Sequence, residues 1–327
     1  MKKLLFSLIC MCVIMSCSKS NDIKVENVPN DYLSVEALAS VAQQNFVNEV
    51  NAIAKEYQNP ATKIEQEDVA AVAEFVLEAA VDGLCGAVGA GWFSWLTGAA
   101  GSALYSEYLD YYKEKGETRA LSSFHMYMDV TKSNVYNELF DRVAFKFCDG
   151  NPMNIQDSIG YIHNEILNEF MRQDSQEYFS VGGNVDLSLF YAKYKNILND
   201  LGYSIIDYSD ENFEKDFRAF FNNVVLPLTN VYMGRLSLDN AFLQIQQSFN
   251  MDAKFAEEDA KFISLLAKNI VLSFSQGVSV NDLPSYAEKV NDALKHSDLS
   301  KDNIIMCKNF FQVMVCSYLY WNFSRKW

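Results

Sequence analysis

The chain has 327 residues, 50% of them apolar and 14% aromatic, which is enough to bury one large core or two smaller ones without a metal or a disulfide. Its formal net charge is −15, and the only clustered late basic residues are Arg325 and Lys326, so we expect no nucleic-acid partner and no attraction to acidic lipid surfaces.

Residues 1 to 17, MKKLLFSLICMCVIMSC, have the layout of a secretory signal, with two lysines followed by a continuous apolar stretch. The apolar stretch is too short to span a bilayer permanently. Because Ile14-Met15-Ser16-Cys17 ends in a small residue before a cysteine, the segment resembles the lipobox of bacterial lipoproteins.

That resemblance implies a lipoprotein signal peptide over 1–16, cleavage before Cys17, and attachment of a diacylglycerol to the Cys17 thiol. Several acyl chains, at about 0.8 kcal/mol per buried methylene, give stable anchoring to a membrane. An ordinary cleaved signal with an incidental cysteine is the alternative. The residue after Cys17 is Ser18. Better-known lipoproteins that are retained in the inner membrane have aspartate at this position. Ser18 therefore indicates the outer membrane, with the protein facing the periplasm or the cell exterior. The polar residues 17–33 are expected to form a flexible lipidated tether.

The remaining residues, 34–327, are predicted to form an all-α domain, a multi-helix bundle with short loops. Apolar residues recur there at three- and four-residue spacings, and the whole chain has only five prolines. A sparse similarity between the segments that begin at Val185 and Asp282 leaves a duplicated helical hairpin open. The expected helices cover about 34–57, 66 into a glycine-rich segment, 105–115, 119–148, 155–180, 186–201, 210–225, 237–249, 256–276, 283–295 and 300–323.

The glycine-rich segment is residues 83–106, which lie between Asp82 and Glu107 and carry no charge. As one helix it would be roughly 36 Å long, enough to cross a hydrocarbon core. Small residues at helical spacing would allow close helix contacts, as in GxxxG pairs, and two tryptophans interrupt the run near its centre. The residues expected to make packing or membrane contacts are Gly83, Ala87, Gly91, Trp92, Trp95, Gly98 and Ser102.

Three interpretations of this segment compete. In the favoured one, it forms two tightly packed core helices that turn near residues 89–95. In the second, it inserts into or lies on a membrane, like the glycine-zipper stretches of pore-forming peptides and some bacteriocins. In the third, it is an exposed surface that binds a partner.

No catalytic or metal-binding motif is evident, so we expect no catalytic residues, no metal and no cofactor. The three histidines lack metal-ligand spacing, and His163 and Glu165, two residues apart, are not expected to share a helix face. His125 and Asp129 are four residues apart, a spacing typical of a surface contact. The body cysteines are Cys85, Cys148, Cys307 and Cys316. We expect them to be free buried thiols, with a long-range disulfide of Cys85 or Cys148 left open.

Together these features predict a membrane-anchored envelope lipoprotein with a non-enzymatic helical domain that has an interaction or structural role. One alternative is a membrane-active protein, bacteriocin-like or toxin-like, that uses residues 83–106. Another is an envelope protein that binds a glycan or other ligand through some of its many aromatic residues. A protein partner is expected in the first case, and the sequence identifies neither it nor a ligand.

Overall fold

The computed structural model describes residues 40–58, 74–88, 101, 103–106, 129–147, 159–173, 185–203, 215, 217–251 and 256–324. The chain divides into two compact units, 1–34 and 35–327, and every described residue belongs to the second unit. The predicted signal peptide, Cys17 and the tether therefore lie outside the described residues.

All the elements formed by the described residues are helical, which confirms the predicted all-α, multi-helix fold. Four short helical turns supplement the longer helices: η4 (Val130–Lys132), η5 (Phe145–Phe147), the π-helical η7 (Phe221–Val225) and η8 (Val280–Asp282). The longer helices are α2 (Val41–Glu56), α3 (Glu74–Val88), α5 (Asn134–Ala144), α6 (Ile159–Arg172), α7 (Leu187–Asp200), α9 (Leu226–Tyr232), α10 (Leu238–Met251), α11 (Glu257–Ser275), α12 (Leu283–Lys295) and α13 (Lys301–Ser324).

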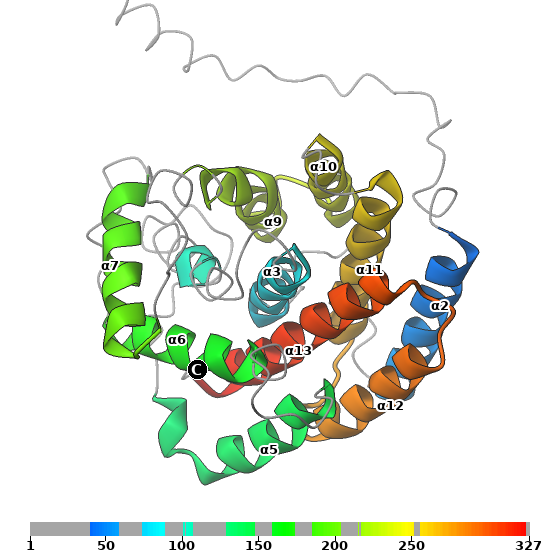
Figure 1. Cartoon of the computed structure of the whole chain (residues 1–327), viewed down its shortest axis with the longest axis horizontal. Coiled ribbons are helices and arrows are strands. Elements are labelled where there is room, and N and C mark those ends of the chain that lie inside the picture. Colours follow the sequence, from blue (N-terminus) through cyan, green and yellow to red (C-terminus); the bar gives the residue numbers. More distant parts are fainter. Residues whose placement is uncertain are drawn as a thin grey trace, which may run out of the picture. The chain divides into compact units, whose positions relative to one another are not determined.

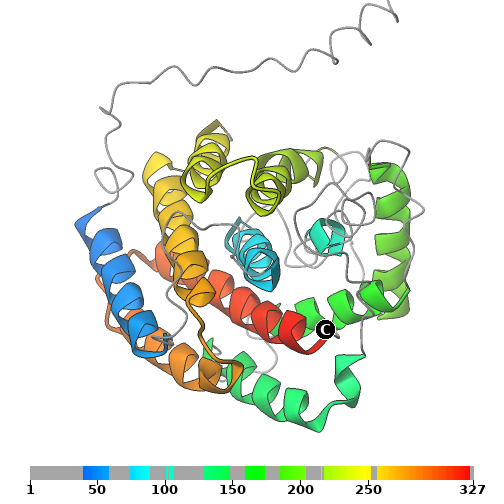
Figure 2. The ribbon, with the colours of Figure 1, turned by 180° about the vertical axis from the view of Figure 1, so that it is seen from behind.

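Helices α3 and α13 lie side by side in the middle of this unit, and both views show the other helices arranged around them (Figures 1 and 2). Helix α13 also contacts α5, α6 and α12, while α11 contacts α2, α3 and α10. The residues from Val76 to Ala87 are all buried, as are nearly all residues of α13 from Met306 to Trp321. These two helices are apolar around most of their circumference because they are enclosed on all sides.

Glycines set the spacing between α3 and α13. A β-carbon at Gly83 would lie 2.8 Å from Met314 Cβ, and one at Gly86 would lie 2.8 Å from the backbone oxygen of Asn309. Both distances are too short for a side chain, so the two backbones approach closely only because α3 has glycine at these positions.

Several predicted helix boundaries are wrong. The helix expected over 155–180 ends at Arg172. The one expected over 210–225 continues through η7 and α9 to Tyr232, because Pro227 falls at the start of α9, where a missing N–H is tolerated. The first helix begins at Val41 and not at Ser34, because Ser40 and Gln43 form a capping box that starts it. The continuous helix predicted over 119–148 is broken at Asp129, whose carboxylate caps the short turn η4 before α5 begins. By contrast, α12 has the predicted bounds, and α7, α11 and α13 are within one residue of theirs.

Candidate functional site

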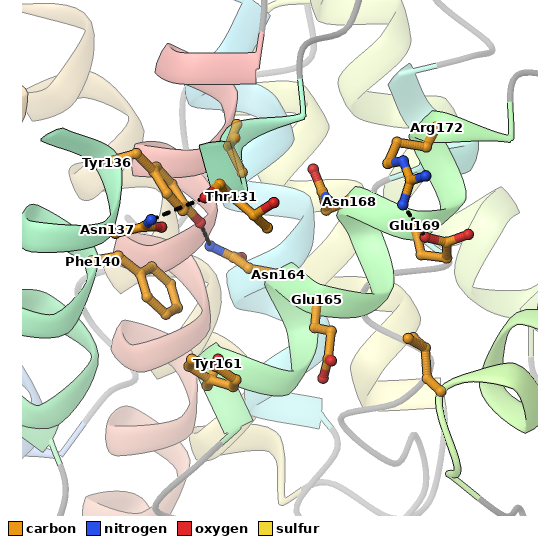
Figure 3. Close-up of a pocket in the computed structure, with 12 residues that line it drawn as sticks. Thr131, Tyr136, Asn137, Phe140, Tyr161, Asn164, Glu165, Asn168, Glu169 and Arg172 are labelled. Atoms are coloured by element: carbon orange, nitrogen blue, oxygen red, sulfur yellow. Dashed lines mark hydrogen bonds and ion pairs between the residues drawn. The ribbon is translucent and has the colours of Figure 1, made fainter. Parts of the chain in front are cut away.

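A pocket with a volume of about 260 Å³ opens where α6 faces η4, α5 and the residues that follow α7 (Figure 3). Most of its described lining is polar, and three of the twelve residues are aromatic. The lining residues are Val130, Thr131, Tyr136, Asn137, Phe140, Tyr161, Asn164, Glu165, Asn168, Glu169, Arg172 and Leu201.

Helix α6 supplies half of that lining from a single face. Residues at three- and four-residue spacings fall on one side of a helix, and here that side is entirely polar or aromatic. The opposite side carries Ile162, Ile166 and Phe170, which belong to the core. The pocket stripe of α6 consists of Tyr161, Asn164, Glu165, Asn168, Glu169 and Arg172.

Gly160 brings this helix against α13. A β-carbon at Gly160 would lie 2.7 Å from the sulfur of Cys316 and 2.9 Å from the backbone oxygen of Gln312. The close approach lets Asn164, one turn later, donate a hydrogen bond of 2.8 Å from Nδ2 to the backbone oxygen of Cys316. The position of the pocket stripe is therefore fixed by contact with the central helix.

Hydrogen bonds hold the polar side chains of the stripe in place. Asn164 Nδ2 also donates to the Tyr136 hydroxyl at 3.0 Å. Glu165 accepts a hydrogen bond of 2.6 Å from the hydroxyl of Tyr203, and Glu169 accepts one of 2.8 Å from Arg172. These groups are arranged before any ligand arrives.

Asn168 lies at the floor of the pocket and is almost fully buried, with 7% of its surface exposed. Its Nδ2 donates to Asp129 Oδ1 at 3.3 Å, while its own Oδ1 has no hydrogen-bond partner among the described residues. The hydrogen bond from the Thr131 hydroxyl is the main cause that lowers the pKa of Asp129, so this carboxylate stays ionised beneath the pocket. A buried amide oxygen without a partner costs free energy, which a ligand hydroxyl could recover.

Aromatic rings from α5 and from the first turn of α6 form one wall of the pocket, the aromatic wall. Tyr161 is 53% exposed, and its ring centroid lies 5.6 Å from that of Phe140. Phe140 in turn stacks on Tyr136, with the centroids 5.4 Å apart. The exposed ring of Tyr161 therefore packs against the buried rings of Phe140 and Tyr136.

The other side of α6 carries a fully buried polar cluster. His163 Nε2 lies 3.2 Å from Asp82 Oδ1 of α3, and the Ser317 hydroxyl of α13 donates to the other oxygen of Asp82. His163 Nδ1 lies 2.9 Å from Asn164 Oδ1, which connects this cluster to the pocket. Although it contains serine, histidine and aspartate, the serine contacts the aspartate and none of the three is exposed, so the arrangement is not that of a nucleophilic triad.

The charge of His163 is stabilised despite its burial. Burial alone lowers the pKa of this imidazole, but the negative charge of Asp82 and hydrogen bonding with Asp82 and Asn164 outweigh it, so the net effect is a raised pKa. Below this raised pKa the two groups form an ion pair enclosed in the core, where removal of either partner leaves the other without compensation.

Of the residues predicted to make packing or membrane contacts, Gly83 and Ala87 are buried in α3. Gly91, Trp92, Trp95, Gly98 and Ser102 lie outside the described residues, as do His125 and Cys148. Cys85, Cys307 and Cys316 are buried thiols, as predicted, and His163 and Glu165 face opposite sides of α6.

Sequence reasoning missed the pocket stripe, although its signal is present. Polar residues at 164, 165, 168, 169 and 172 repeat with helical spacing after the aromatic Tyr161. The contact of Asp82 with His163 had no sequence signal, because the two residues are far apart in the chain and were brought together by the packing of α3 on α6 and α13.

In the part of the chain that the structure describes, no group of three or more histidines, cysteines and carboxylates is placed to hold a metal ion. Within the same residues, no helix is both long enough and apolar enough to cross a membrane. Comparison with protein-family models, curated proteins and solved structures finds no match to this chain.

Proposed function

We propose that this chain is a lipid-anchored protein of the bacterial cell envelope, held in the outer membrane through Cys17, whose helical domain binds a ligand and catalyses no reaction. The lipobox-like residues 14–17 support the anchor. The binding role depends on one observation, the pocket on α6 with its prearranged polar and aromatic lining.

The chemistry of the lining favours binding over catalysis. The described lining contains no serine, cysteine, histidine or lysine, so its candidate nucleophiles and bases are carboxylates. Its two carboxylates, Glu165 and Glu169, are one turn apart, but each already accepts a hydrogen bond from a neighbouring side chain. Groups held in this way position a ligand more readily than they transfer its protons.

The packing of α3 favours binding over membrane activity. The described start of the glycine-rich segment, residues 83–88, belongs to α3, and Gly83 and Gly86 contact α13 so closely that a β-carbon would not fit. Exposing this surface to a bilayer would separate the two central helices. We therefore assign this part of the segment a packing role.

The anchor is tested by expressing the full chain in bacteria fed an alkyne-labelled fatty acid. Covalent labelling that is lost in Cys17→Ser and kept in Cys12→Ser supports lipidation at Cys17. Equal labelling of both variants would contradict it.

The binding role is tested with the full lipidated chain in a zwitterionic detergent, by saturation-transfer NMR against four classes of small polar molecule. These are neutral saccharides, amino acids, linear polyamines and dicarboxylates. Binding of any class that is abolished by Tyr161→Ala supports a ligand site on α6. If no class binds, or if binding is unchanged in Tyr161→Ala, the proposed function is wrong.

A further inference from the structure

We infer that the pocket on α6 is a saccharide site, which takes a neutral, polyhydroxylated ring stacked on Tyr161. This inference rests on the proposed function and adds the chemical class of the ligand. Four observations support it: the aromatic wall, the planar polar groups, the charge of the lining and the size of the cavity.

The aromatic wall provides a surface for the apolar face of a sugar ring. Tyr161 presents more than half of its surface to solvent, whereas Phe140 and Tyr136 behind it are buried and fix its position. An exposed aromatic ring with a rigid backing buries apolar ligand area at little cost in conformational entropy. The C–H face of a pyranose is a suitable partner for such a ring.

The polar wall offers both donors and acceptors in fixed planes. Asn164 and Asn168 carry amide groups, Glu165 and Glu169 carry acceptor oxygens, and Arg172 carries a donor fork. Neighbouring hydroxyls of a sugar each donate and accept, so they require this mixture. The unpartnered Oδ1 of Asn168 gives one buried acceptor for a ligand hydroxyl.

The charge of the lining disfavours an anionic ligand. Glu169 is paired with Arg172 at 2.8 Å and also accepts from Gln173, while Glu165 accepts from Tyr203. Beneath the pocket, Asp129 lies 3.5 Å from Lys132. Tyr203 is a neutral donor, so Glu165 keeps its negative charge and the described lining repels an anion. A cation is the competing ligand class, and the titrations below separate it from a neutral saccharide.

The size of the cavity fits one ring. Its volume of about 260 Å³ lies just below the roughly 300–1,000 Å³ typical of pockets for larger organic ligands. A single saccharide unit would occupy the pocket, and further units of a chain would extend from it over the surface.

The test is a titration of the full lipidated chain, kept in a detergent without a sugar head group, with glucose, galactose, mannose, N-acetylglucosamine, maltose and cellobiose. We expect at least one to bind in the millimolar range or tighter, and Tyr161→Ala to weaken binding by roughly tenfold or more. Leu189→Ala, which truncates an exposed apolar side chain on neighbouring α7, is the matched control and should leave binding unchanged. Circular dichroism checks that each variant is folded.

A second variant separates a neutral ligand from a cation. Glu165→Gln removes a charge but keeps an acceptor for Tyr203, so a cationic ligand should lose roughly tenfold in affinity and a saccharide, which loses only the charge assistance of one hydrogen bond, should lose less. Lysine and putrescine are titrated beside the sugars. If they bind in a Tyr161-dependent way and no sugar does, the saccharide inference is overturned while the proposed function stands. If no probe binds, both are overturned.

Discussion

The contact of α3 with α13 and the pocket stripe of α6 differ in what accounts for the residue types found there. In α3, residues 76–87 are all buried, and its glycines are required by the neighbouring backbone. In α6, Asn164 and Asn168 line an opening, and the Oδ1 of Asn168 has no hydrogen-bond partner among the described residues. Folding explains the first region, and the second is the one that we propose binds a ligand.

The largest expected effect is on the buried ion pair that lies between these regions. Asp82→Ala leaves the His163 imidazolium without its partner, which costs about 3–5 kcal/mol in the free energy of unfolding. Urea denaturation at pH 6 measures it. Asp141→Ala, on the exposed side of α5, is the control and should change stability by less than about 0.5 kcal/mol. A loss below 1 kcal/mol for Asp82→Ala would mean that the pair is not formed.

The glycine contacts of α3 should give a graded series. Gly86→Ala places a β-carbon 2.8 Å from a backbone oxygen, which cannot move cheaply, so it should cost about 1–3 kcal/mol. Gly83→Ala should cost a similar amount, since it meets Met314 Cβ at 2.8 Å and this atom moves only with the backbone of α13. Gly101→Ala meets only the end of the Phe220 ring at 3.0 Å and the Cys85 sulfur at 3.2 Å, and should cost least. The same urea series ranks them, and an inverted order would contradict the observed packing.

A smaller effect is expected in the dependence of stability on pH. Because the pKa of His163 is raised in the folded state, the ion pair contributes fully below the unfolded pKa of about 6.5, and its contribution declines as pH rises through the folded pKa. The double variant Asp82→Asn, His163→Gln has no titrating group at this site. The stability difference between the native chain and this variant should therefore fall as pH rises above about 6.5. A difference that stays flat or grows would contradict the raised pKa.

The fold was largely predictable from the sequence, and the site was not. The bounds of α12 followed from a proline at its start and regular apolar spacing, which are local signals. The break at Asp129 was missed because the aspartate acts through a hydrogen bond to Thr131 that competes with helix formation. The pocket needed two further facts, the contact of Gly160 with Cys316 and the position of α5 opposite Tyr161, and both depend on tertiary packing.

Hydrogen exchange on the delipidated protein, with and without lipid vesicles, tests most directly whether the two regions differ as described. Amides of residues 76–87 and 306–319 should exchange only through global unfolding, because both segments are enclosed in the core. Lipid vesicles should not change their exchange rates. Rapid exchange of residues 76–87, or protection of them that appears only with vesicles, would contradict this prediction and favour a membrane-active protein instead.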